Sequence, residues 1–207
     1  MKDWGGKMKK VSYLFLLVVL CFALFPTRNI CGAEFKGVKR IRMTINSDEL
    51  AVTFFKLSAG EATLIQSSDQ AILVNTGDKA SRDELVRKLK VFNMDHIDSL
   101  IITNGGKSYI GNLDTLVNTF DVSKIYTSAP IYHHMCEDEK RPYCFLFDVW
   151  SQDIYYPLDI LKAEVIEIDD SGNLNVLFRY GKNTLLYLGD TLSKDIQKNL
   201  SQKDFKA

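Results

Sequence analysis

Short apolar segments separated by polar turns dominate the chain from residue 51 onward. Runs of about four to eight apolar or alternating residues, bounded by turn residues, are typical of β-strands. The predicted strands cover residues 51–57, 62–66, 71–75, 97–103, 124–127, 164–168, 174–180 and 184–188, and the last two form a predicted hairpin that turns at residues 181–183. Strands mixed with short helices indicate a layered α/β domain.

Helical signals occur in three places along the same region. Ser81 and Glu84 match a capping box, and Leu85, Leu89 and Phe92 recur on one face, so a helix is predicted as far as residue 93. Second and third helices are predicted over residues 110–120 and 191–200. Residues 130–157 follow neither period and are expected to be irregular.

The first 33 residues have the pattern of a targeting segment. Lys7, Lys9 and Lys10 precede an unbroken apolar run over residues 11–25, and Pro26 ends it. Such a run is typical of a secretory signal, whereas a membrane span needs roughly 20 apolar residues. We expect residues 1–33 to be a signal peptide or signal anchor, and residues 34–207 to be a single domain. The expected location is exported, extracellular or at the cell surface, and residues 11–25 tether the chain to the membrane if the signal is not cleaved.

The net charge weighs against nucleic acid as a partner. The whole chain is formally neutral, but residues 34–207 carry 21 basic and 25 acidic residues, a net charge of −4. Non-specific binding of DNA comes mainly from phosphate neutralisation by clustered Lys and Arg. An acidic body of this kind favours a small ligand or a protein as the partner.

Cys136 and Cys144 are the cysteines of the predicted domain, and they bracket a polar loop that contains Pro142. In an oxidising compartment such a pair can close a short loop by a disulfide. The alternative is a zinc site that adds His133 and His134 to the two thiolates, although the spacing matches no zinc knuckle or finger. A disulfide is the favoured expectation.

Three segments are similar, in order and spacing, to the metallo-β-lactamase-like domain of ComEC-type competence proteins. Residues 54–65 (FFKLSAGEATLI) match the opening strand and turn, and residues 73–77 (LVNTG) match a Leu-Ile-Asp-Thr-Gly segment. Residues 101–113 (IITNGGKSYIGNL) align without a gap with the loop that carries the family's His-x-His-x-Asp-His metal ligands. The resemblance covers roughly residues 50–200 and implies a metallo-β-lactamase-like layered αββα sandwich, truncated at its C-terminus.

The family's metal chemistry is not retained in these segments. The resemblance implies zinc as the cofactor, but Asn104, Gly106, Ser108 and Tyr109 stand where the family has His, His, Asp and His, and Asn75 replaces an acid. Zinc prefers imidazole, thiolate and carboxylate ligands. We therefore expect no metal and no metal-dependent hydrolase activity.

One matched ligand position keeps its carboxylate. Residues 173–190 resemble the family's hairpin that ends in Gly-Asp, which places Asp190 at the bridging carboxylate. The alternative role of Asp190 is to cap a helix that begins near Thr191. In the replaced loop, the amides of Gly105 and Gly106, with Lys107, either form an anion-binding nest or belong to a flexible surface loop.

The leading functional hypothesis is a non-catalytic binding module, exported or surface-tethered, on a degenerate metallo-β-lactamase-like fold. Its candidate pocket is the vestigial metal site, composed of Asn75, Asn104, Gly105, Gly106, Lys107, Ser108, Tyr109 and Asp190. One alternative is a residual hydrolase that combines Asp190 with His133 or His134. The other is an accessory factor in DNA uptake, which rests on the family resemblance alone.

Overall fold

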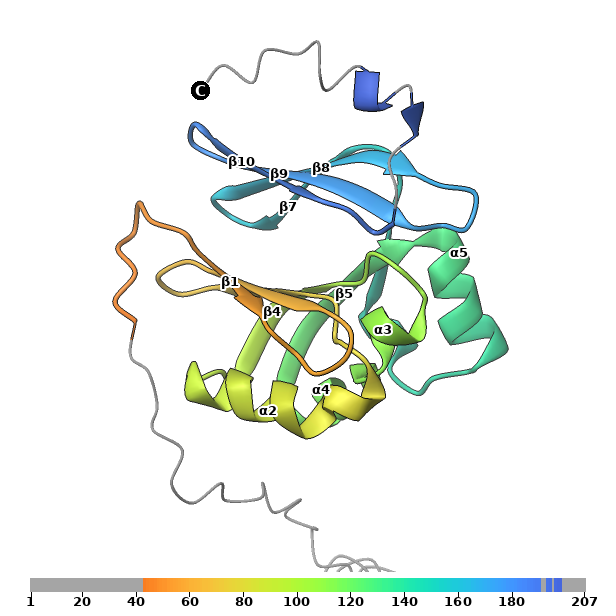
Figure 1. Cartoon of the computed structure of the whole chain (residues 1–207), viewed down its shortest axis with the longest axis horizontal. Helices are drawn as coiled ribbons and strands as arrows, with labels where there is room; N and C mark the ends of the chain where they lie inside the picture. The colour runs from red at the N-terminus through yellow and green to blue at the C-terminus, as the bar shows by residue number, and fades with distance from the viewer. Residues whose placement is uncertain (1–42, 191–192, 195, 199–207) are drawn as a thin grey trace, which may run out of the picture. The chain divides into compact units, whose positions relative to one another are not determined.

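Two β-sheets packed face to face form the centre of the molecule (Figure 1). The computed structural model describes residues 43–190, 193–194 and 196–198. The first sheet contains, in this order, β1 (Ala51–Phe55), β2 (Ala62–Gln66), β3 (Ala71–Val74), β4 (His96–Ile101), β5 (Asp121–Ser128) and β6 (Phe147–Trp150). The second contains β7 (Ile154–Leu158), β8 (Leu161–Ile168), β9 (Leu174–Tyr180) and β10 (Asn183–Tyr187), in the order β10-β9-β8-β7. The predicted targeting segment lies outside the described residues.

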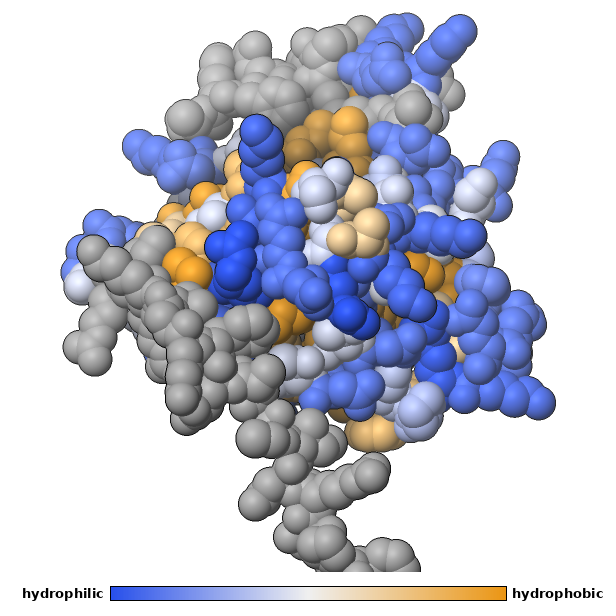
Figure 2. Space-filling view, turned by 60° about the horizontal axis from the view of Figure 1, so that its bottom comes forward, coloured by the Kyte–Doolittle hydropathy of each residue, from blue (hydrophilic) through white to orange (hydrophobic). Residues whose placement is uncertain are grey.

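The first sheet changes from antiparallel to parallel pairing at β3. β1, β2 and β3 form an antiparallel meander, whereas β3 to β6 run parallel. Parallel neighbours need crossover connections. Helix α2 (Arg82–Val91) supplies the crossover from β3 to β4, and α4 (Leu113–Thr119) lies in the crossover from β4 to β5. Both helices cover the outer face of the first sheet, and the face that they present to solvent is largely hydrophilic (Figures 1 and 2).

Each face of the first sheet buries its own apolar core. One core joins the sheet to the helices and includes Leu64, Leu73, Leu85, Leu89, Leu100 and Leu116. The other fills the space between the two sheets and includes Ile65, Ile72, Trp150, Val165, Val176 and Phe178. The first sheet is therefore buried on both faces along β3 and β4, which explains the apolar character of those strands. The strands β2 and β9 have the predicted bounds.

Helix α2 forms where the sequence predicted it, but the capping box does not. The side chain of Ser81 makes no cap to the helix and instead donates a hydrogen bond to the carbonyl of Asp78 at 2.8 Å. The carboxylate of Glu84 accepts a hydrogen bond from the amide of Ser58 at 2.8 Å. Both cap residues therefore bind neighbouring loops, and tertiary contacts replace the local motif.

The helix predicted over residues 110–120 is divided into two. A single turn, α3 (Lys107–Ile110), is separated from α4 by Gly111 and the buried Asn112. The side-chain amide of Asn112 donates to the carbonyls of Thr76 and Asp78, each at 2.8 Å. The prediction was wrong here because docking of this loop onto the loop after β3 interrupts the helix.

The segment predicted to be irregular, residues 130–157, contains regular structure. It includes α5 (Ala129–Tyr132), a π-helical turn (His133–Asp138), a 3₁₀ turn (Cys144–Leu146), and the strands β6 and β7. Trp150 stacks between Tyr126 and Tyr155, with ring centroids 4.9 and 4.6 Å apart. Trp150 and Tyr155, which belong to this segment, are therefore packing groups. Among the described residues, no helix has the length and apolar character needed to cross a membrane.

Gly60 lies where three loops meet: the β1–β2 turn, the loop after β3 and the loop after β4. Its φ is +73°, and a Cβ atom there would collide with the backbone of Asp78 and of Ser108. Gly181, in the β9–β10 turn, also has a positive φ of +56°, but a Cβ atom there would meet nothing within 4 Å. A comparison of substitutions at the two glycines therefore distinguishes the free-energy cost of a positive φ from the cost of a steric collision.

We predict that Gly60→Ala destabilises the fold far more than Gly181→Ala. The positive φ alone costs an alanine about 1 kcal/mol. At Gly60 the backbone collisions bring the expected total to about 3 kcal/mol or more. Urea unfolding of the two variants measures both values. Equal losses would contradict the close packing of the three loops.

Candidate functional site

The side-chain amide of Asn75 lies at the centre of the vestigial site. Asn75 follows β3 with a φ of +60° and is fully buried. Its Oδ1 accepts from the amide nitrogen of Thr103 at 2.9 Å and from Thr103 Oγ1 at 3.1 Å. Its Nδ2 donates to Glu61 Oε1 at 3.1 Å and lies 3.4 Å from the hydroxyl oxygen of Tyr187. A neutral amide thus satisfies donors and acceptors from both sheets at the position where the resembling family has an acid.

Tyr187 connects this network to the second sheet. Its hydroxyl donates to Glu61 Oε1 at 3.0 Å from the inner face of β10. Burial raises the pKa of Tyr187 well above its ordinary value, and the neighbouring Glu61 carboxylate raises it further. The phenol therefore stays protonated and serves as a hydrogen-bond donor.

Backbone hydrogen bonds lock the loop after β4 onto its neighbours. The carbonyl of Tyr109 accepts from the backbone amide of Thr76 at 2.6 Å and from its hydroxyl at 2.9 Å. The carbonyl of Ser108 accepts from the amide of Glu61 at 3.2 Å, and the amide of Gly111 donates to Gly77 at 2.9 Å. The loop that carries metal ligands in the resembling family thus has a fixed backbone here.

The side chain of Asn104 is fully engaged by protein groups. Asn104 Nδ2 donates to the carbonyl of Gly189 at 2.8 Å, and Oδ1 accepts from the amide of Gly106 at 2.7 Å. The Gly106 amide is therefore not free for the proposed anion nest, and neither Gly105 nor Gly106 has a positive φ. The side chain of Lys107 is exposed.

Tyr109 and Asp190 lie near Glu61 on the exposed side of the Asn75 network, and we call these three residues the mouth of the site. Partial burial raises the pKa of Tyr109 above its ordinary value, and the carboxylates of Glu61 and Asp190 add to the rise. Tyr109 therefore remains a neutral phenol and a poor metal ligand. Asp190 is exposed, and its predicted helix-capping role involves Thr191, which lies outside the described residues. Together, Glu61, Tyr109 and Asp190 give the mouth an acidic character.

The residues at this site do not fit a zinc ion. The side-chain oxygens and nitrogens of Asn75 and Asn104 already hydrogen-bond to protein groups. Gly106 has no side chain that could bind a metal ion. Ser108 and Tyr109 offer only neutral hydroxyl groups, which zinc does not favour. Within the described residues, no group of three or more His, Cys, Asp or Glu side chains is suited to hold a metal ion.

His133 and His134 project from the π-helical turn and do not complete the vestigial site. His133 Nε2 lies 3.1 Å from Glu137 Oε2, and His134 Nδ1 lies 3.6 Å from Asp138 Oδ2. Both imidazoles are more than half exposed and contact carboxylates of their own segment. The geometry gives no support to their pairing with Asp190 in a residual hydrolase.

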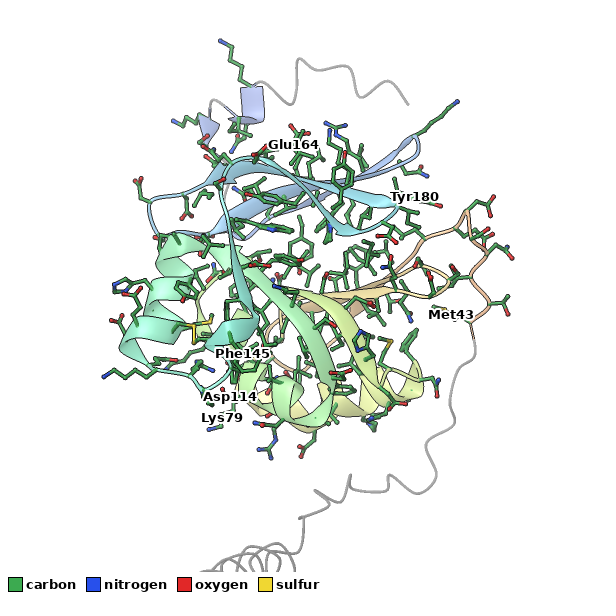
Figure 3. All side chains as sticks on the ribbon, turned by 180° about the vertical axis from the view of Figure 1, so that it is seen from behind. Met43, Lys79, Asp114, Phe145, Glu164 and Tyr180 are labelled. Atoms are coloured by element: carbon green, nitrogen blue, oxygen red, sulfur yellow. A yellow bond between two sulfur atoms is a disulfide. The ribbon has the colours of Figure 1, made fainter. Side chains whose placement is uncertain are left out.

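Cys136 and Cys144 form a disulfide with a Cα–Cα distance of 5.6 Å, as the sequence predicted. The zinc site that used both thiolates is therefore ruled out in this oxidised state. Arg141, inside the closed loop, pairs with Asp114 of α4 at 2.7 Å and with Glu139 at 2.6 Å. The loop is thus fastened to α4 next to the exposed Phe145 (Figure 3).

Solved structures identify the fold. A metallo-β-lactamase with a HARLDQ motif from Cronobacter sakazakii matches with a TM-score of 0.57 and 15% identity, over 76% of this chain and 65% of that one. The metallo-β-lactamase fold protein YhfI from Bacillus subtilis matches with a TM-score of 0.58 and 16% identity, over 74% and 68%. A probable metal-dependent hydrolase from Staphylococcus aureus matches with a TM-score of 0.53 and 11% identity, over 72% and 74%. The chain therefore has a metallo-β-lactamase fold, and the likeness at this identity shows the fold alone.

Sequence comparisons add no closer identification. No protein-family profile matches the chain, and no curated protein matches it either. The chain spans less than two thirds of the length of the Cronobacter enzyme.

Three residues of the network were not predicted from the sequence. Thr103 and Glu61 belong to segments that carry the family resemblance, but their roles depend on Asn75. Tyr187 lies 112 residues from Asn75, and nothing in the hairpin pattern distinguishes it from a core tyrosine. The buried Asn75, next to a Gly turn, was the available signal, because a buried amide requires partners.

We predict that Asn75→Asp destabilises the protein by about 2–4 kcal/mol at pH 7. The change removes the donor to Glu61 and places two carboxylates side by side. Burial and the Glu61 charge would raise the pKa of the new carboxyl group in the folded state above its unfolded value. The added loss should therefore grow as pH rises above the unfolded pKa and diminish as pH falls. Urea unfolding at pH 4 and pH 7 measures this, with exposed Asn118→Asp as control. A pH-independent loss would refute the network.

We predict that the double variant Cys136→Ser, Cys144→Ser loses about 2–3 kcal/mol of stability, the loop-closure value for so short a loop. The salt bridges of Arg141 should keep the segment docked on α4. Urea unfolding with and without reductant gives the measurement. If reduction leaves the wild-type midpoint unchanged, the bond does not constrain the unfolded chain.

Proposed function

We propose that this chain is a non-catalytic binding module on a metallo-β-lactamase fold, exported or tethered to the cell surface. The observation that carries this proposal is the hydrogen-bond network of Asn75 with Thr103, Glu61 and Tyr187. Such a network stabilises the loops without a metal ion. In a metal-dependent hydrolase the metal lowers the pKa of a bound water to produce the nucleophile. The side chains at this site are poorly suited to hold such a metal.

The charge at the mouth of the site supports a positively charged binding partner. Glu61 and Asp190 lie near Tyr109, and among the described residues no Lys, Arg or His side chain forms an ion pair with either carboxylate. A cationic group would be attracted to this mouth, whereas a nucleic acid phosphate would be repelled. The partner is therefore a small ligand or a protein segment with a basic group.

The sequence also supports a proposed origin and location for this module. The four segments similar to ComEC-type domains support descent from that branch, with the site released from its original chemistry. The disulfide supports an oxidising compartment outside the cytosol, as does the pattern of residues 1–33. This origin does not imply a role in DNA uptake, because the acidic body disfavours DNA.

The proposal predicts that the full chain binds no zinc or manganese at stoichiometric level. Native mass spectrometry after zinc loading measures the metal content, and thermal unfolding with and without zinc supplies a second readout. We expect neither bound metal nor a shift in Tm. One or two tightly held ions per chain would refute the proposal. Phosphodiester hydrolysis that disappears in Asp190→Ala would refute it as well.

A further inference from the structure

An apolar groove opens between the two sheets at the end of the sandwich remote from the vestigial site. Strand β10 begins at this groove with Asn183 and ends at the Asn75 network with Tyr187. The groove has a volume of about 260 Å³, and its lining includes Val52, Phe54, Ile65, Leu161, Phe178 and Leu185. Its floor belongs to the core between the sheets, whereas the wall residues Val52 and Phe54 remain 39% and 64% exposed.

A second cavity continues this groove beyond the ends of the strands. It has a volume of about 600 Å³, and its lining includes Asp48 and Glu49. The residues that line both cavities are Leu50, Tyr180 and Asn183. Figure 3 shows Tyr180 of the second sheet above Met43, which also lines the second cavity. The two cavities therefore form one continuous depression, which we call the end cleft.

The polarity of the end cleft changes in one direction. Tyr180 lies opposite Asn183 at the strand ends, where the two cavities meet. Phe178 lies opposite Leu185 two residues further into the groove. From the second cavity inward, a ligand would thus contact carboxylates, then neutral polar side chains, and then apolar surface. This order fits a molecule with a polar head and one apolar chain, whereas side chains of a peptide strand alternate between two faces.

The charges of the end cleft favour a cationic head. The carboxylate of Glu49 accepts a hydrogen bond from the amide of Asn46 at 3.0 Å, and this bond lowers the pKa of Glu49. Asp48 is exposed beside it. Among the described residues, no Lys, Arg or His lines either cavity. An ammonium group would therefore be attracted to this end of the cleft, and a sulfate or phosphate group would be repelled.

We propose that the end cleft binds a free amphiphile that has one aliphatic chain and an ammonium head. The chain lies between the sheets against Val52, Phe178 and Leu185, and its burial removes apolar surface from water. The head lies in the second cavity with Asp48 and Glu49. This binding site uses none of the residues of the vestigial site, so the proposal stands or falls independently of the function proposed above.

Alkylammonium probes test the apolar part of the end cleft. In calorimetric titrations of the full chain below the micelle concentration, the Kd of hexyl-, octyl- and decylammonium should fall about three- to fourfold for each methylene that the groove buries. Val52→Trp fills the groove from its partly exposed wall and should raise the Kd of octylammonium about tenfold or more. Val149→Trp, on β6 at a position 46% exposed, is the matched control and should bind as the wild type does.

An unchanged Kd in Val52→Trp would overturn the proposal. It would place the aliphatic chain elsewhere on the protein, such as on the apolar run of residues 11–25.

Charge variants test the head separately from the chain. The double variant Asp48→Asn, Glu49→Gln should raise the Kd of octylammonium about tenfold and leave the Kd of uncharged 1-octanol unchanged. Asp170→Asn removes an exposed acid from the β8–β9 turn and is the control for net charge. Octyl sulfate should bind the wild type more weakly than octylammonium does. Equal affinity for the sulfate and the ammonium would overturn the proposal.

Two other occupants of the end cleft give different results with the same probes. A second copy of the chain would appear in sedimentation as a dimer that Val52→Trp dissociates, and octylammonium would not bind to it. Occupation by the chain's own basic residues would allow octylammonium to bind only after Arg40→Gln and Arg42→Gln. Either result, or the absence of binding by every probe, would overturn the proposal.

Discussion

The amide of Asn75 is the interaction on which the rest of this structure depends. It lies where β3 ends, and it holds Thr103 after β4, Glu61 after the β1–β2 turn and Tyr187 on β10. These groups come from both sheets, so one side chain fixes how the sandwich closes at this end. An ionised acid at the same position would accept hydrogen bonds but could not donate to Glu61.

The backbone of the loop after β4 is held independently of the side chains at the positions where the resembling family binds metal. The backbone of residues 104–112 is fixed by hydrogen bonds to Glu61, Thr76 and Gly77, and none of these bonds requires a metal ligand. Asn112 adds two contacts to the loop after β3 from a fully buried position. The loop can therefore keep its shape although Asn, Gly, Ser and Tyr stand at the positions where the resembling family has metal ligands. What remains at the surface is an acidic mouth.

The regular core was predictable from the sequence, and its long-range contacts were not. β2 and β9 have the expected bounds because alternation and turn residues specify them locally. The prediction of a single helix over residues 110–120 was wrong because Gly111 packs against the backbone of Asp78 and Lys79. Only the fold brings these residues together. The candidate site was proposed from the spacing of the residues that stand at the family's ligand positions. The role of Tyr187 was missed because its partner Glu61 lies 126 residues away in the chain.

The disulfide between Cys136 and Cys144 changes the consequence of proteolytic cleavage within the loop that it closes. Lys140 is exposed at the tip of the closed loop, with a φ of +52°, and exposed loop tips are preferred sites of proteolytic cleavage. A trypsin-like protease would cut after Lys140, whereas Arg141 is held in salt bridges and is followed by Pro142. Cys136 and Cys144 lie on opposite sides of that cut. A nicked molecule would therefore keep both fragments covalently joined, and α4 would still hold the fragment that begins at Arg141.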